Sequence, residues 1–151
     1  MCWMCDHPTA TFDDYLDEVV RPTVARCGYA VQATDWRGLP MAYTVGRTER
    51  GEPELVVTGK PPDEAHDLLA ALLAGEERPA VDSRCDLLQG PALWALLVER
   101  PERLSVAWRL YPELTALQVV WADTFGRWPW EVHRSRQRLL SLPKDRWQLA
   151  G

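Results

Sequence analysis

The segment 116–131, with the sequence ALQVVWADTFGRWPWE, constrains the fold most strongly. Its first part is an apolar run of the kind that forms strands, and an Asp-Thr-Phe-Gly turn follows directly. Trp121, Trp128 and Trp130 place three of the eight tryptophans of the chain around this one turn. We therefore expect a strand over Ala116–Ala122, at whose end the tryptophans close a small core or form a binding surface.

Size and charge narrow the class of protein. The chain has 151 residues, of which 46% are apolar, and this is enough to bury the core of one domain over residues 1–151. The formal net charge of −5 argues against nucleic acid as a partner. The sequence has no apolar stretch long enough to span a membrane and no pattern of a secretion signal at its start. These features predict a cytoplasmic protein without a membrane partner.

The apolar periodicity and the turn residues predict a single α+β domain. Its sheet should be mostly antiparallel, with about five strands, and two or three helices should pack on one face. One helix should follow an N-cap at Thr11, be kinked or interrupted at Pro22 and end at Gly28. Strands are predicted over Tyr29–Thr34, Pro40–Val45, Glu54–Thr58, Cys85–Gln89 and Ala92–Val98. The last of these can also be interpreted as a helical turn. Further helices are predicted over Pro62–Ala74 and, shorter, over Pro101–Leu110.

The two ends of the chain stand apart from this pattern. Residues 1–8 form a segment rich in cysteine and histidine. Residues 132–151 form a tail, peripheral to the domain, with a short helical or irregular piece around Arg134–Leu142. The tail carries several arginines, which suit either a solvated face or contact with a phosphate-bearing partner.

Cys2, Cys5 and His7 are the candidate metal ligands. Two thiolates three positions apart, with an imidazole close by, can chelate zinc or another transition metal. A tetrahedral site would need a fourth ligand from elsewhere in the chain. The same spacing also permits a redox-active dithiol, and a third interpretation is that the thiols are inert.

A second group of polar residues is predicted to gather at the ends of neighbouring strands. An arginine beside carboxylates and a tyrosine hydroxyl can bind an anionic or polar small molecule, and a pair of carboxylates can perform acid–base chemistry. In the alternative interpretation the same residues only support the fold, as turn residues, a buried amide and members of surface ion pairs. The candidate ligand-binding residues are Tyr43, Thr44, Arg47, Glu54, Gln118 and Asp123, together with Trp128 and Trp130 as an aromatic wall.

Three pieces of the sequence resemble one family. They are the N-terminal CWMCDHP, AYTVGRTERGEPELVVTG at 42–59, and the segment 116–131. Their content and spacing are similar to the bacterial family called domain of unknown function 4262 (DUF4262). Two positions depart from that family, since Arg47 stands where leucine is usual and Lys60 where a small or apolar residue is commoner. The resemblance implies a fold unit and a set of marked positions rather than an activity.

Three functions are therefore open. The first is a small cytosolic binding or accessory domain that holds a metal ion at its N-terminal cysteine/histidine cluster. The second is an enzyme that uses the polar residues beside a pocket walled by tryptophans. The third is a protein-interaction module of the immunity type, which would expose Trp128 and Trp130 to a protein partner.

Overall fold

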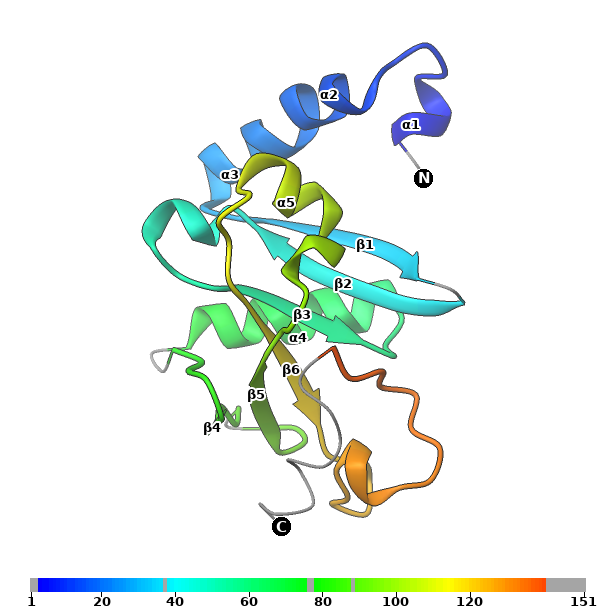
Figure 1. Ribbon diagram of the computed structural model, residues 1–151, viewed down its shortest axis with the longest axis vertical. Helices are drawn as coiled ribbons and strands as arrows, with labels where there is room; N and C mark the ends of the chain where they lie inside the picture. Colours follow the sequence, from blue (N-terminus) through cyan, green and yellow to red (C-terminus); the bar gives the residue numbers. More distant parts are fainter. Residues whose placement is uncertain (1–2, 37, 76–77, 88, 141–151) are drawn as a thin grey trace.

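The computed structural model contains one six-stranded sheet with the strand order β1-β2-β3-β6-β5-β4 (Figure 1). The structure describes residues 3–36, 38–75, 78–87 and 89–140. All neighbouring strands pair antiparallel except β3 and β6, which pair parallel. The strands are β1 (Ala30–Trp36), β2 (Leu39–Val45), β3 (Glu54–Thr58), β4 (Ser83–Arg84), β5 (Leu93–Leu97) and β6 (Ala116–Trp121). The predicted α+β class and mostly antiparallel sheet are thus confirmed.

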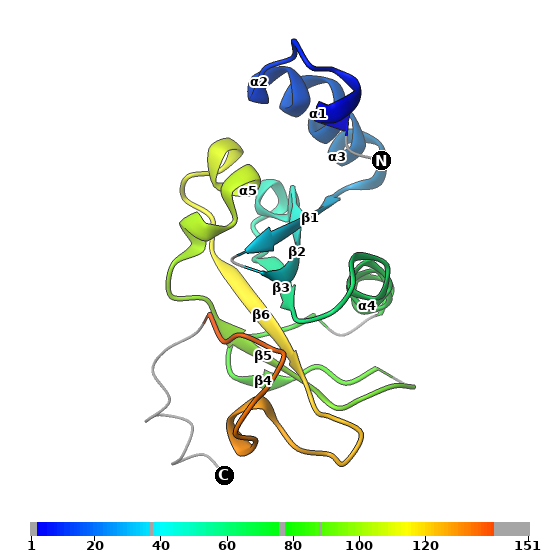
Figure 2. The same cartoon turned by 90° about the vertical axis from the view of Figure 1, so that its right-hand side faces the viewer.

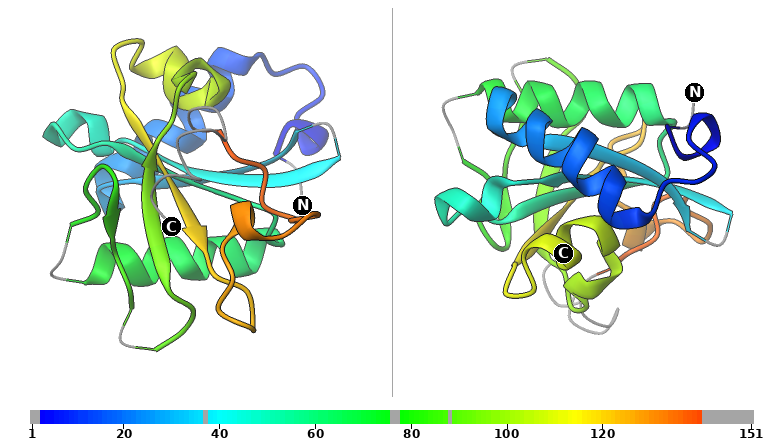
Figure 3. Two further views of the ribbon diagram at one scale, coloured as in Figure 1. Left: turned by 60° about the horizontal axis from the view of Figure 1, so that its bottom comes forward. Right: turned by 90° about the horizontal axis from the view of Figure 1, so that it is seen from above.

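Helices occupy both faces of this sheet, whereas one face was predicted. Figures 2 and 3 show α4 on one side of the twisted sheet and α5 on the other. The β-strands are apolar on both faces, so each face needs a cover. The helices are α1 (Trp3–Asp6), α2 (Phe12–Tyr15), the π-helical η1 (Leu16–Val20), α3 (Arg21–Cys27), η2 (Arg47–Arg50), α4 (Pro62–Ala74), η3 (Pro101–Arg103), α5 (Ser105–Leu110) and η4 (Pro129–Glu131).

The helical segment 12–27 begins and ends where its sequence predicts. Thr11 and Asp14 form a capping box, in which each side chain accepts a hydrogen bond from the backbone N–H of the other residue. Gly28 ends the helix with a φ of 86°. The interruption at Pro22 takes the form of a π-helical turn, in which the N–H of Arg21 donates to the carbonyl of Leu16. The wider turn makes room for the proline ring, which would collide with the preceding turn of an α-helix.

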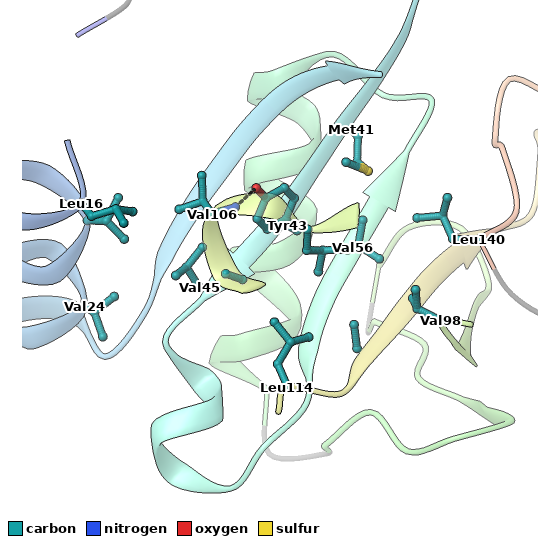
Figure 4. Packing of buried hydrophobic residues seen from close by; sticks show 14 residues of the cluster. Leu16, Val24, Met41, Tyr43, Val45, Val56, Val98, Val106, Leu114 and Leu140 are labelled. Carbon is teal, nitrogen blue, oxygen red and sulfur yellow. Dashed lines mark hydrogen bonds between the residues drawn. The ribbon is translucent and has the colours of Figure 1, made fainter. Parts of the chain in front are cut away.

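Each face of the sheet has its own core. On the α5 side, Tyr43 is 1% exposed, and its hydroxyl accepts a hydrogen bond from the N–H of Val106 at 3.1 Å (Figure 4). The helical segment 12–27 contributes Leu16 and Val24 to this cluster. On the other face, α4 packs Leu69 and its neighbours on β3 and β6. The two cores fix the sheet between helices, so the loops at its ends have rigid bases.

Two predicted elements differ from the structure. The strand predicted over Cys85–Gln89 lies earlier, at β4, because the Asp86 carboxylate accepts the N–H of Leu93 at 2.7 Å and ends the backbone pairing. The tail is not peripheral over its described part, since residues 132–140 are irregular but contact β6 and the end of β3. Within the described residues, no helix combines the length and apolar character that crossing a bilayer requires.

Candidate functional site: an arginine pocket

A buried carboxylate holds the loop between β2 and β3. Glu54 is fully buried, and its Oε1 accepts from the hydroxyl of Thr44 at 2.9 Å and from the N–H of Arg47 at 3.2 Å. Its Oε2 accepts from the N–H of Thr48 at 2.8 Å and from the Thr48 hydroxyl. The Thr44 hydroxyl in turn accepts from the N–H of Leu55 at 2.8 Å. Four donors satisfy the carboxylate, so Glu54 fixes the loop that begins at Arg47.

Arg47 is the buried cation of this loop. Its side chain is 6% exposed, its Nε donates to the carbonyl of Pro53 at 2.9 Å, and its Nη1 lies 3.2 Å from Oε2 of Glu52. Burial lowers the pKa of Arg47, and the carboxylates of Glu52 and Glu54 partly oppose this effect. A guanidinium remains charged at neutral pH even when its pKa is lowered, so Arg47 presents a fixed positive charge.

A cavity of about 410 Å³ opens beside Arg47. In Figure 1 the end of α3, the η2 loop and the end of α4, which line it, lie near one another on the left-hand side of the molecule. The arginines of this cavity share the carboxylate of Glu52. Its Oε2 lies 3.8 Å from Nη2 of Arg50, and its Oε1 lies 2.7 Å from Nη1 of Arg78. Three positive charges thus surround one negative charge. We call this cavity the arginine pocket; its other walls include Cys27, Tyr29, Leu72, Leu73 and Pro79.

The arrangement suits an anion with an apolar part. Guanidinium groups form paired, charge-assisted hydrogen bonds with carboxylates and phosphates. One carboxylate among three arginines leaves an excess of positive charge and unused donors. Leucine and proline side chains supply an apolar wall beside these charges. The volume falls within the range of about 300–1,000 Å³ that is typical of small-molecule sites.

The structure brings together only part of the predicted polar group. Thr44, Arg47 and Glu54 meet at the loop just described. Tyr43 lies in the core on the other face of β2, under α5. Gln118 and Asp123 lie elsewhere, under the tail and in the turn after β6. The polar residues of the enzyme hypothesis therefore do not share one cavity.

Gln118 anchors the tail. It is fully buried, and its Nε2 donates to the hydroxyl of Thr58 at 3.1 Å and to the carbonyl of Arg138 at 2.7 Å. Its Oε1 accepts from the N–H of Leu140 at 2.7 Å. All these partners belong to the chain itself, so the amide is used for folding.

The turn after β6 is held by Asp123. Its Oδ1 accepts from the N–H groups of Phe125 and Arg127, both at 2.9 Å, and its Oδ2 pairs with Nε of Arg127 at 2.9 Å. These bonds hold the pKa of Asp123 below its usual value, with the backbone bond from Arg127 as the main cause. Trp128 and Trp130 are half-buried and stack at 5.4 Å between ring centroids.

The N-terminal cluster is described only in part. Cys5 and His7 are exposed on and just after α1, and the predicted ligand Cys2 lies outside the described residues. His7 stacks on Trp3 at 4.2 Å, and its Nδ1 lies 2.9 Å from the Trp3 carbonyl. Across the described parts of the chain, no group of three or more histidine, cysteine or acidic side chains is arranged to hold a metal.

Most residues of the arginine pocket were not predicted from the sequence, among them Glu52, Arg78 and Cys27. Glu52 stands beside Pro53, just before β3, and carries no local signal of its shared role. Arg78 follows α4, and Cys27 ends α3. Their meeting with Arg47 depends on how the helices pack on the sheet, which no short motif encodes.

A comparison with protein families supports the resemblance found in the sequence. The family described as "Domain of unknown function (DUF4262)" matches residues 23–135. This stretch includes the whole sheet and Arg47, Arg50, Glu52 and Arg78. Neither the curated proteins nor the solved structures include a significant match. Because the family match covers most of the chain, the protein belongs to the DUF4262 family.

Proposed function

We propose that this DUF4262 domain binds a small organic anion in the arginine pocket. The observation that carries the proposal is the sharing of one carboxylate, Glu52, by three guanidinium groups around a cavity of about 410 Å³. A carboxylate or phosphate of the ligand would take the donors that Glu52 leaves unused. The apolar wall would contact the body of the ligand.

The pocket combines a fixed and an adaptable part. Arg47 is held by Pro53 and by the loop that Glu54 fixes, so it loses little freedom when a ligand binds. The side chain of Arg78 is 79% exposed and can follow the shape of the ligand. Its position after α4 makes it the best residue to change, because its removal leaves both cores intact.

Calorimetric titration with succinate and phenyl phosphate tests the proposal, with neutral succinamide as the uncharged control. We expect saturable binding of at least one anion and none of succinamide. Arg78→Ala should weaken this binding at least about tenfold, the effect of losing one charge-assisted contact. Arg84→Ala is the matched control, since Arg84 is also exposed and paired with a carboxylate but does not line the pocket. Equal loss in both variants, or no saturable binding of either anion, would contradict the proposal.

We further propose a zinc site at Cys2, Cys5 and His7, with the protein working in the cytosol, where thiols stay reduced. His7 supports it. Because the Trp3 carbonyl can only accept a hydrogen bond, Nδ1 of His7 donates to it, and Nε2 is the ring nitrogen that remains for a metal. A backbone partner on the second ring nitrogen is the usual arrangement of a metal-binding histidine.

Elemental analysis of protein purified without chelator tests the zinc site. We expect near-stoichiometric metal in the native chain and its loss in a Cys2→Ser/Cys5→Ser variant. Cys85→Ser serves as the control, because this thiol is buried beside α4. Less than about a tenth of an equivalent of metal in the native protein would be too little for a structural site, which binds zinc very tightly.

A further inference from the structure

A second cavity, of about 220 Å³, lies where the tail passes the end of β6. In Figure 1 residues 132–140 of the tail run to the right of the end of β6, on the opposite side of the molecule from the η2 loop. We call this cavity the tail pocket. The residues that line it include Trp121, Asp123, Arg134, Ser135, Arg136 and Gln137.

The backbone that carries the two arginines is fixed. Gln137 is 6% exposed, and its amide makes both hydrogen bonds with the backbone of Trp121, accepting its N–H at 2.8 Å and donating to its carbonyl at 2.6 Å. The carbonyl of Arg136 lies against Gly59, so closely that a Cβ at position 59 would stand 2.5 Å from it. The pocket is therefore built on a positioned segment and not on a free chain end.

Its unused polar groups are all donors. Arg134 and Arg136 are exposed, and no carboxylate of the described residues pairs with either. The indole Nε1 of Trp121 is buried and has no acceptor within the described chain. Ser135 accepts the N–H of Gln137 at 3.1 Å, which leaves its own O–H proton free to donate. A buried donor without a partner is rare and calls for an acceptor.

The charges in and around the tail pocket favour an anion. Lys60 places its Nζ 4.1 Å from the centre of the Trp121 ring, and it shares its charge with Glu64, whose Oε2 lies 3.8 Å away. Asp123 is the opposing carboxylate, but Arg127 and two backbone N–H groups already occupy it. Two guanidinium groups with no carboxylate partner among the described residues thus line the same cavity as a neutralised carboxylate.

We infer that the tail pocket is a second anion site, which binds a phosphate group. A phosphate offers three or more acceptor oxygens, which matches two guanidinium groups and one hydroxyl. The cavity is about half the size of the arginine pocket, so it fits a phosphate with little attached to it. This inference does not depend on the function of the arginine pocket.

Nuclear magnetic resonance of the tryptophan indole N–H groups tests the site directly. The Trp121 signal is assigned by its loss in Trp121→Phe, and inorganic phosphate is titrated at constant ionic strength. We expect a saturable shift of this signal. Arg134→Ala/Arg136→Ala should weaken the apparent affinity at least about tenfold. Arg100→Ala/Arg109→Ala removes the same charge from exposed positions outside the pocket and should leave the affinity unchanged.

Other outcomes would overturn the inference. They are no saturable shift, a shift that follows ionic strength alone, or a shift that survives in Arg134→Ala/Arg136→Ala. Arg78→Ala should not alter the phosphate affinity, so the result is separate from that for the arginine pocket. A parallel titration with glycerol 2-phosphate decides the source: tighter binding of the monoester indicates a phosphorylated metabolite, and tighter binding of inorganic phosphate indicates the free ion.

Discussion

At the scale of single residues, Glu54 shows how a buried charge can serve the fold. Its carboxylate is fully buried, yet four donors from Thr44, Arg47 and Thr48 satisfy it. Such a group is costly to disturb, because each donor left without an acceptor adds a desolvation penalty. The residue fixes the loop of the arginine pocket without lining the pocket itself.

The substitution Glu54→Gln measures this dependence. The amide NH₂ would face two N–H or O–H donors, so we expect a loss of about 2–4 kcal/mol in the free energy of unfolding. Urea denaturation monitored by fluorescence gives the value. Glu49→Gln is the matched control, since Glu49 is exposed and accepts one hydrogen bond from Tyr111, and it should cost less than about 1 kcal/mol. Equal costs for the two substitutions would show that the buried network contributes nothing special.

Cys85 supplies a prediction about pH. Burial, with a smaller contribution from Asp86, raises the pKa of this thiol from 9.0 to about 11. The folded state therefore keeps the proton that the unfolded state releases, and stability must fall as the pH rises from 9 through 11. The size of the shift corresponds to a loss of up to about 3 kcal/mol. Cys85→Ala should lack this part of the fall when both proteins are denatured in urea at pH 8 and pH 11. If Cys85→Ala and the unaltered protein lost the same stability between pH 8 and pH 11, this prediction would be wrong.

At the scale of elements, the tail depends on close contact between backbones. Gly59 has a φ of +84°, and a Cβ there would stand 2.5 Å from the carbonyl of Arg136. Gly38 has a similar φ of +81° but open space around it. Gly59→Ala and Gly38→Ala thus share the conformational penalty of a positive φ, and only the first adds a clash.

We expect Gly38→Ala to cost about 1–2 kcal/mol of stability, the penalty for a left-handed residue. Gly59→Ala should cost clearly more and should speed hydrogen exchange at the N–H of Leu140, which Gln118 holds. Exchange measured by mass spectrometry or NMR distinguishes the two variants. If both glycines respond alike, the tail is not held by this contact.

The sequence predicted some elements better than others for physical reasons. The ends of α4 and β3 agree with the prediction, because proline, glycine and apolar runs are local signals. β4 and the tail carry no periodic pattern and depend on contacts made by Asp86 and Gln118. Of the arginine pocket, Arg47 was predicted together with Glu54, which fixes its loop and is close in sequence. Arg78 was not predicted, because the packing of α4 brings it to the pocket.

At the scale of the whole molecule, the arginines give an acidic protein two local regions of positive charge. The net charge of −5 disfavours large polyanions, while each pocket attracts a small anion over a distance of about 8 Å at physiological salt. The two pockets differ in burial. Arg47 is held inside the protein, whereas Arg134 and Arg136 are exposed. Salt should therefore weaken binding in the tail pocket more steeply than binding in the arginine pocket.

The two pockets share no lining residue, so their effects on stability should add. A ligand at a hundred times its dissociation constant stabilises the folded state by about 2.7 kcal/mol. For a domain of this size, that raises the melting temperature by roughly 5–10 °C. We expect an organic anion bound in the arginine pocket and inorganic phosphate to give separate increases that sum when both are present. Because a tenfold loss of affinity lowers the stabilisation to about 1.4 kcal/mol, Arg78→Ala should at least about halve only the first increase, and Arg134→Ala/Arg136→Ala only the second. Thermal denaturation at constant ionic strength measures both. If either variant reduced both increases, the two anions would share one site, and the separation of the pockets would be wrong.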